Sequence, residues 1–391
     1  RGLVVGGGIA GMTAALALAE TGFECYLVER EPELGGILKR IYYTLDTERV
    51  QRYLQELVHR VKAHPLIHVY TQSTVESVVG NVGNFTTTLS SGNGHKEQVV
   101  LEHGVVIVAT GGEENKPTEY LYGQHPNVIT QLDLESKLEE QGWKPGSSDQ
   151  VVMIQCVESR ESQRPYCSRI CCGEAIKNAL RIKRANPDTN VFVLYRDIRT
   201  YGFKESAYNQ AREEGVIFIP YDLDSKPQVV GDGANLQVRV MDPVMGEEIA
   251  IDADWLVLSV AVSPRPDNGV LAQMLKVPLN DDGFFLEAHA KLRPVDFATE
   301  GVFLCGLAHA PKYMDEHITQ ANAAAARACT ILTQEIIEAE GTIPKVNVAR
   351  CVACGLCELV CAYSAISVEV VDQRRGIKAA VVNEALCKGC G

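Results

Sequence analysis

The chain has 391 residues and a formal net charge of −13. This charge argues against binding to nucleic acid or to anionic lipid, because both need clustered basic residues. No apolar stretch reaches the roughly 18 residues that a membrane span needs. The length predicts two or three domains. Thirteen cysteines, mostly in clusters, indicate metal thiolates in a reducing compartment, so we expect a cytoplasmic protein.

The first motif is a glycine-rich turn between a short apolar strand and an Ala- and Leu-rich helix. Gly6 permits the tight turn, Gly8 lets the backbone approach a pyrophosphate, and Gly11 lets the helix pack on the strand. Glu29 ends a second apolar strand, at the distance expected for a carboxylate that binds a ribose. We therefore predict a bound dinucleotide. The alternative is a glycine-rich turn beside an ordinary surface glutamate.

The first block continues with an amphipathic helix over residues 47–64 and with strands near residues 68–78 and 85–89. It ends with an apolar strand over residues 105–108 that runs into Ala-Thr-Gly at residues 109–111. A strand followed by these residues resembles the segment that returns under the cofactor in flavoproteins of the thioredoxin reductase type.

Two further segments resemble that family. Gly36, with the glycine before it, resembles its second glycine pair, and the strand ending at Gly306 resembles its final flavin-binding strand. Three matches in the expected order favour FAD over NAD. Leu307 departs from the family, which has an aspartate there. The predicted cofactor-binding residues are Gly6, Gly8, Gly11, Glu29, Arg30, Gly36, Thr110, Gly111, Gly306 and Gln320.

An Ala-rich helix is expected over residues 319–339, with its N-terminus directed at the flavin ring or pyrophosphate. The alternative is an ordinary packing helix.

The middle block begins with an apolar strand over residues 151–155, where the thioredoxin reductase family begins its NAD(P)H-binding domain. A second glycine loop is expected next, but the sequence continues with Cys-Val-Glu-Ser-Arg. Without glycine at the turn, the backbone cannot approach a pyrophosphate closely. We therefore predict that this block binds no NAD(P)H.

Four cysteines replace that loop, three of them near the start of one helix. They match the number of thiolates that an iron–sulfur cluster requires. A zinc site more usually shows two C-x-x-C pairs. A redox dithiol and inert core cysteines remain alternatives. The predicted ligands are Cys156, Cys167, Cys171 and Cys172.

The C-terminal segment contains a C-x2-C-x2-C-x3-C run, which is the spacing of a two-cluster ferredoxin. Three of these thiolates serve one cluster, and the fourth serves its neighbour. Each cluster lacks one ligand within the sequence, so we expect the domain to be truncated and the two missing cysteines to lie just beyond Gly391. The predicted ligands are Cys351, Cys354, Cys357, Cys361, Cys387 and Cys390.

The FAD motif, the internal cysteine group and the ferredoxin motif together resemble the A-type subunit of heterodisulfide reductase. The resemblance implies [4Fe-4S] clusters at both cysteine groups and an oxidoreductase whose flavin bifurcates electrons between ferredoxin and a disulfide-reducing partner. It implies other subunits of the B and C types, and a hydrogenase or formate dehydrogenase as electron donor. It also implies a homodimer within a larger complex.

The family has a lysine beyond the paired cysteines and near the flavin, and Lys177 is the candidate for that place. An ammonium near the ring favours its anionic reduced form. The alternative is a surface lysine on a helix over residues 173–184.

We therefore predict an α/β flavoprotein with two Rossmann-like dinucleotide-binding domains and a truncated α+β ferredoxin-like domain. Competing functions are an FAD-dependent pyridine nucleotide-disulfide oxidoreductase and a noncatalytic electron-transfer subunit. The expected boundaries are 1–116 and 263–343 for the FAD-binding domain, 117–262 for a degenerate NAD(P)H-like domain, and 344–391 for the ferredoxin domain.

Overall fold

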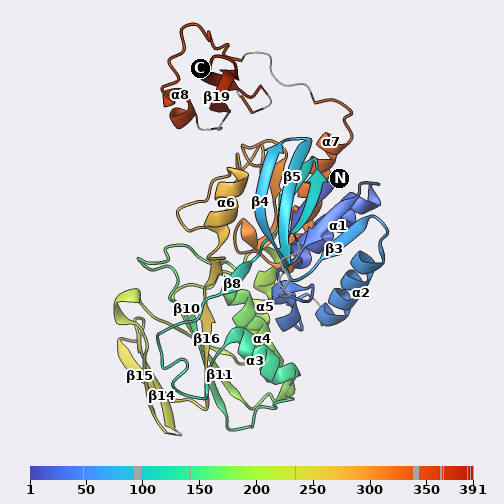
Figure 1. Ribbon diagram of the computed structural model, residues 1–391. Helices are drawn as coiled ribbons and strands as arrows, with labels where there is room; N and C mark the ends of the chain where they lie inside the picture. The colour runs from blue at the N-terminus through green and yellow to red at the C-terminus, as the bar shows by residue number, and fades with distance from the viewer. Residues whose placement is uncertain are drawn as a thin grey trace.

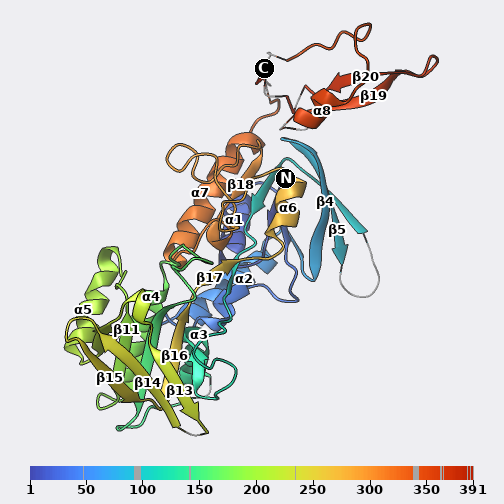
Figure 2. The same cartoon turned by 90° about the vertical axis from the view of Figure 1, so that its left-hand side faces the viewer.

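Two parallel five-stranded sheets dominate the computed structural model, and a smaller C-terminal part lies apart from both (Figure 1). Figure 2 shows the same separation after a quarter turn. The structure describes residues 1–46, 48–91, 98–140, 142–233, 235–337, 343–361, 363, 365–384, 386–387 and 389–390.

The first sheet has the strand order β18-β7-β1-β2-β3, with all neighbours parallel. Every residue of β2 and β7 is buried, because helices and a second sheet cover the two faces and such strands are apolar throughout. The strands are β1 (Gly2–Val5), β2 (Cys25–Val28), β3 (Ile67–Tyr70), β7 (Val105–Val108) and β18 (Val302–Leu304).

One face of this sheet is covered by α1 (Ile9–Glu20), α2 (Val50–Ala63) and α7 (Met314–Leu332). Alanines of α1 and α7 share one core, since small side chains let these helices approach closely. The helix expected over residues 47–64 is confirmed as α2. The helix expected over 319–339 begins earlier, at Met314, because the Tyr313 N–H donates to the Glu316 carboxylate and caps it.

The opposite face packs on a three-stranded antiparallel sheet and on α6 (Asn268–Leu275). The strands of this sheet are β4 (Ser73–Asn81), β5 (Asn84–Ser91) and β6 (Gln98–His103).

The second parallel sheet has the order β12-β11-β10-β16-β9. One face packs on helices α3 (Gln131–Glu139), α4 (Cys171–Ala185) and α5 (Glu205–Glu213). The other packs on the antiparallel strands β13 (Gln228–Asp232), β14 (Asn235–Asp242) and β15 (Glu247–Asp252). The parallel strands are β9 (Val128–Thr130), β10 (Gln150–Val157), β11 (Asn190–Tyr195), β12 (Ile217–Pro220) and β16 (Trp255–Val260).

The chain passes between the two larger parts through β8 (Gly112–Glu114) and β17 (Val262–Pro264), which pair antiparallel. The domain boundaries expected after residues 116 and 262 stay predictions. The structure thus confirms the α/β class with two Rossmann-like sheets.

The C-terminal part contains the short helix α8 (Leu356–Val360) and the hairpin of β19 (Ile366–Asp372) and β20 (Ile377–Val382). Among the described residues, no helix is long and apolar enough to cross a membrane.

Candidate cofactor-binding site

The turn between β1 and α1 forms a cradle in which three glycines are needed for different reasons. A Cβ on Gly6, whose φ is 114°, would lie 2.2 Å from the Ala109 carbonyl oxygen. A Cβ on Gly11 would lie 1.8 Å from the Gly6 carbonyl oxygen. A Cβ on Gly8 would meet no atom within 4 Å, and its φ of −76° suits any residue. Packing therefore explains Gly6 and Gly11, whereas Gly8 leaves open the space in which the predicted cofactor would lie.

Gly8 faces a cavity, here called the first cavity, at the N-terminal end of α1. The free N–H groups at a helix start favour a phosphate. Seven of the ten predicted cofactor-binding residues line it: Gly6, Gly8, Glu29, Arg30, Gly36, Thr110 and Gly111.

Glu29 is held at the edge of the first cavity by backbone groups. Its carboxylate accepts hydrogen bonds from the N–H of Gly7 at 2.6 Å and of Glu31 at 2.9 Å. Arg30 pairs with Asp267 at 2.7 Å. Asp267 comes from α6's N-terminal boundary and also lines the cavity, a role that no sequence motif indicates.

The other three predicted residues lie behind the lining. Gly11 packs on Gly6. The Gly306 N–H donates to the Gln320 side-chain oxygen at 2.9 Å, and the Gln320 amide donates to His309 Nδ1 at 2.8 Å. Gln320 therefore stabilises the turn after β18 and does not line the first cavity.

A second cavity adjoins the first and lies between the two larger parts of the chain. Both cavities share part of their lining, namely Ile9, Ile37, Leu38, Leu307 and His317. The second cavity is lined further by Cys171, Gly173 and Lys177 of α4. An elongated ligand in the first cavity thus has a route toward the predicted cysteine site.

Two basic residues at this junction have lowered pKa values. Burial lowers the pKa of His317 to about 4, so its ring is neutral at neutral pH. Burial, followed by the charge of Arg169, lowers the pKa of Lys312 to about 8. The sequence patterns gave neither residue a role at the site.

The four internal cysteines gather where β10 ends and α4 begins. The pairing of β10 with β16 shifts between Ile154 and Val157, and Cys156 has a φ of 59°. This turn has a left-handed residue where a glycine would be favourable, yet residues 156–160 contain no glycine.

These thiols influence one another electrostatically. Burial, and then the thiols of Cys172, Cys156 and Cys167, raises the pKa of Cys171 well above its ordinary range. Burial and neighbouring thiols raise the pKa of Cys172 to about 12. Four sulfur donors, of which Cys156 and Cys172 are buried and the other two partly exposed, suit a cationic inorganic group, because iron favours the thiolate form.

Nearby N–H groups also suit sulfur ligands. The Arg169 backbone N–H donates to Cys167 Sγ at 3.3 Å, and the Arg160 guanidinium lies 3.8 Å from Cys156 Sγ. Among the described residues, no three His, Cys, Asp or Glu side chains are arranged around a single metal ion. A cubane differs from a single ion, because each thiolate binds its own iron atom. The ligand set remains a prediction.

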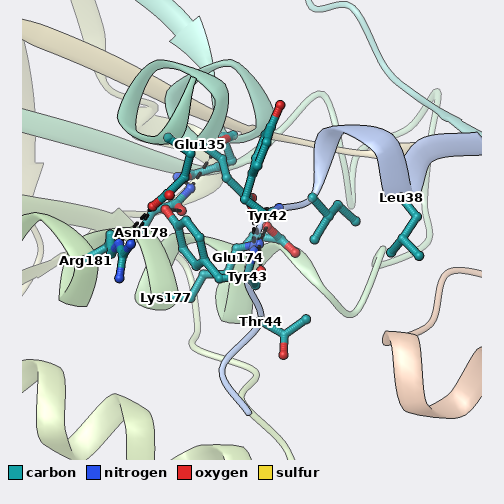
Figure 3. A network of polar contacts seen from close by, with 12 residues as sticks. Leu38, Tyr42, Tyr43, Thr44, Glu135, Glu174, Lys177, Asn178 and Arg181 are labelled. Carbon is teal, nitrogen blue, oxygen red and sulfur yellow. Dashed lines mark hydrogen bonds and ion pairs between the residues drawn. The ribbon is translucent and has the colours of Figure 1, made fainter. Parts of the chain in front are cut away.

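Lys177 lies in a buried polar network shown in Figure 3. Its ammonium lies 2.7 Å from Glu135 Oε2, lies 2.7 Å from Glu174 Oε2, and donates to the Tyr43 carbonyl oxygen at 2.9 Å. Lys177 is only 5% exposed, so the alternative of a surface lysine is wrong. Its role toward a flavin stays a prediction.

The charges of this network support one another. Burial raises the pKa of Glu135. Burial would lower the pKa of Lys177, but Glu174 and Glu135 outweigh this effect and raise it. The lysine therefore stays charged because two carboxylates lie beside it.

Glu135 also joins the two larger parts of the chain. Its fully buried carboxylate accepts hydrogen bonds from the N–H of Tyr42 at 2.5 Å and of Tyr43 at 3.1 Å, both in the segment before α2. The Tyr43 hydroxyl donates to Asn178 Oδ1 at 2.8 Å. Sequence reasoning missed Glu135, because α3 shows no pattern that separates this carboxylate from those on a solvated face.

The C-terminal cysteines lie around α8 and the hairpin. Cys351 Sγ accepts a hydrogen bond from the Ala380 N–H at 3.4 Å, which lowers the pKa of this thiol, and Cys361 Sγ accepts one from the Ala365 N–H at 3.3 Å. Cys354 and Cys390 are exposed. Cys357 and Cys387 are partly exposed, and the assignment of all six as ligands remains a prediction.

Comparisons with known proteins agree with this arrangement. Residues 1–154 match the family described as pyridine nucleotide-disulphide oxidoreductase. The A-type iron-sulfur subunit of the CoB–CoM heterodisulfide reductase of Methanocaldococcus jannaschii is 34% identical, over 93% of this chain and 69% of that protein. The chain belongs to the family of A-type iron-sulfur subunits of heterodisulfide reductase.

Other members of the family are similarly close. The A-type subunit of the H(2):CoB-CoM heterodisulfide,ferredoxin reductase of Methanothermobacter marburgensis is 32% identical, over 94% of this chain and 69% of that protein. Membership makes the chain an oxidoreductase. The sequence-based recognition of the family is thereby confirmed.

Solved structures confirm the fold. The thioredoxin reductase of T. acidophilum superimposes with a TM-score of 0.57 and 17% identity, over 85% of this heterodisulfide reductase homologue and 98% of that chain. The thioredoxin reductase of Lactococcus lactis gives the same TM-score with 16% identity, over 85% and 98% of the two chains. At this identity, the likeness concerns the fold alone.

The cradle can be tested by two substitutions with opposite expected effects. Gly8→Ala should leave the unfolding free energy of the flavin-free protein within about 0.5 kcal/mol of wild type, because the new Cβ meets nothing. It should weaken FAD binding about tenfold, or about 1.4 kcal/mol, because the Cβ enters the cradle. Gly11→Ala should cost about 3 kcal/mol of stability. Urea unfolding measures the stability of each variant, and flavin-fluorescence titration measures its FAD affinity. Equal losses of stability in the two variants would contradict the different roles of Gly8 and Gly11.

The buried network predicts a contrast between two glutamates of α3. Glu135→Gln should lower the unfolding free energy by about 3 kcal/mol or more, because it leaves Lys177 with an incomplete set of buried partners. Glu139, which pairs with Arg181 at 2.6 Å on the surface, is the matched control, and Glu139→Gln should cost about 1 kcal/mol or less. Urea unfolding measures both changes. Similar losses in the two variants would show that Glu135 does not hold the parts together.

Proposed function

We propose that this chain is the FAD- and iron–sulfur-containing electron-transfer subunit of a heterodisulfide-reductase-like complex. The observation that carries the proposal is the replacement of the second glycine loop by four neighbouring thiols, beside a cavity that adjoins the dinucleotide cradle. Such a site exchanges electrons with an inorganic group where related folds exchange hydride with a nicotinamide.

Each part of the site has a role in this proposal. The start of α1 and Gly8 hold the FAD pyrophosphate, and Glu29 binds the ribose. The four internal cysteines hold one [4Fe-4S] cluster, and the C-terminal cysteines serve two more. Bound there, FAD supplies two-electron uptake with one-electron release, and the clusters supply one-electron steps. Lys177 lies at the second cavity as the proposed residue that adjusts the flavin electrostatically.

The names of relatives support the proposed partners. One relative is named as part of an H(2):CoB-CoM heterodisulfide,ferredoxin reductase, and another as part of an H(2)/formate:CoB-CoM heterodisulfide,ferredoxin reductase. We propose that electron pairs from a hydrogenase or formate dehydrogenase are divided between ferredoxin and a disulfide-reducing partner. The proposal includes subunits of the B and C types, a homodimer within a cytoplasmic complex, and no nucleic-acid partner.

A pyridine nucleotide-disulfide oxidoreductase is the second candidate, because the first 154 residues match that family. This match ends just before Cys156, where the nicotinamide-binding loop would begin. The lack of glycine at residues 156–160 supports the first candidate.

The internal cluster predicts a defined loss of iron. Replacing both Cys171 and Cys172 with alanine in the full-length protein should remove about four iron atoms per flavin. Cys25→Ala is the control, because Cys25 is buried in β2 and belongs to no proposed ligand set. Iron, sulfide and FAD are measured in each purified protein. Undiminished iron per flavin in the double variant would rule out a cluster at these residues.

The two candidate functions differ in their response to NADPH. We expect no decrease in flavin absorbance when the FAD-loaded protein is mixed with NADPH without air, because the turn after β10 cannot approach a pyrophosphate. Dithionite serves as the positive control for flavin reduction. Rapid bleaching by NADPH would favour the pyridine nucleotide-dependent reductase.

A further inference from the structure

The Tyr313 hydroxyl is a buried polar group with no hydrogen-bond partner among the described residues. Leaving a buried hydroxyl unpaired costs about 1–3 kcal/mol. The rest of this side chain is well held, since its ring lies 5.3 Å from the Tyr201 ring and 4.7 Å from the Lys204 amine. These contacts fix the position of the hydroxyl oxygen.

The hydroxyl is directed at the first turn of α4. A Cβ on Gly173 would lie 2.4 Å from the Tyr313 oxygen and 3.0 Å from the nearest ring carbon. Only glycine therefore permits this contact, and Gly173 directly follows the pair Cys171–Cys172. The phenol oxygen is thus packed on the backbone beside the two cysteines.

The protonation state of the phenol suits a donor. Burial, then the neighbouring Tyr201 and the thiols of Cys172 and Cys171, raises the pKa of Tyr313. The hydroxyl keeps its proton across the physiological range. Sulfur atoms of an iron–sulfur cluster are acceptors of such hydrogen bonds, which help to set the reduction potential.

We propose that Tyr313 donates a hydrogen bond to a sulfur atom of the cluster held by Cys171 and Cys172 and thereby raises its reduction potential. This inference rests on the proposed function, since it requires the internal cluster. A donor stabilises the reduced cluster more than the oxidised one, because reduction adds negative charge to the sulfurs. No covalent bond is formed or broken at Tyr313.

A flavin is the rival acceptor, because Tyr313 and Gly173 also line the second cavity. The two acceptors are distinguished by which redox couple responds to loss of the hydroxyl. The cluster couple is identified by its electron paramagnetic resonance signal, which the double variant of Cys171 and Cys172 should lack.

The experiment is a redox titration of the full-length, cofactor-loaded protein followed by this signal. Tyr313→Phe removes only the hydroxyl and should reduce the equilibrium constant for cluster reduction about tenfold, which is about 59 mV for one electron. Gly173→Ala should shift the potential in the same direction, because the added Cβ displaces the phenol.

Tyr201→Phe is the matched control. The Tyr201 hydroxyl already donates to Glu316 at 2.9 Å and accepts from Arg169 at 3.0 Å, so its removal should leave the cluster potential unchanged.

Three results would overturn the inference. They are an unchanged cluster potential in Tyr313→Phe with normal iron content, a shift confined to the flavin, and an equal shift in Tyr201→Phe. If Tyr313→Phe binds no iron, the cluster potential of Gly173→Ala is the deciding measurement. A wild-type potential in Gly173→Ala would reject the proposed hydrogen bond. Failure of the proposed function is recognised separately, by iron that persists in the double cysteine variant.

Discussion

The buried carboxylate of Glu135 is the contact on which the arrangement of the site depends. It accepts two backbone N–H groups from the segment before α2 and pairs with Lys177 of α4, with no exposed surface of its own. Separating these groups would leave charges unpaired in a dry environment, at a cost of several kcal/mol. The two parallel sheets are thereby fixed relative to each other. The second cavity is lined by residues of both parts. The contacts of Glu135 therefore keep the start of α4 beside the dinucleotide cradle.

Local sequence patterns predicted the cradle, the parallel sheets and the loss of the second glycine loop, because each depends on residues close together in the chain. They did not predict contacts between distant segments. Glu135 meets Tyr43 across 92 positions, and nothing in either segment indicates the pairing. The helix α7 begins at Met314 and not at residue 319, because the capping contact between Tyr313 and Glu316 leaves no mark in the Ala-rich pattern. Lys177 was identified by resemblance, yet its two carboxylate partners become visible only in three dimensions.

Three glycines illustrate how a missing side chain can have different causes. At Gly11 the neighbour is backbone, so the requirement is architectural. At Gly173 the neighbour is the Tyr313 ring, so the requirement is a specific contact between α4 and the start of α7. At Gly8 there is no neighbour, so packing gives no reason for glycine, and the predicted cofactor would supply one. The sequence motif does not separate the roles of its glycines. The atoms that surround each absent Cβ show which glycines are required by packing.

The loop that carries the internal cysteines is costly to fold. Cys156, Glu158 and Arg160 have φ values of 59°, 48° and 61°, in the left-handed region that glycine adopts more readily. Each such residue costs on the order of 1 kcal/mol. An inorganic centre bound by the proposed cysteine ligands would offset this cost and would thereby stabilise the loop. In that case, folding of the loop after β10 would depend on the cellular supply of iron and sulfide. A shortage of either would leave this loop misfolded.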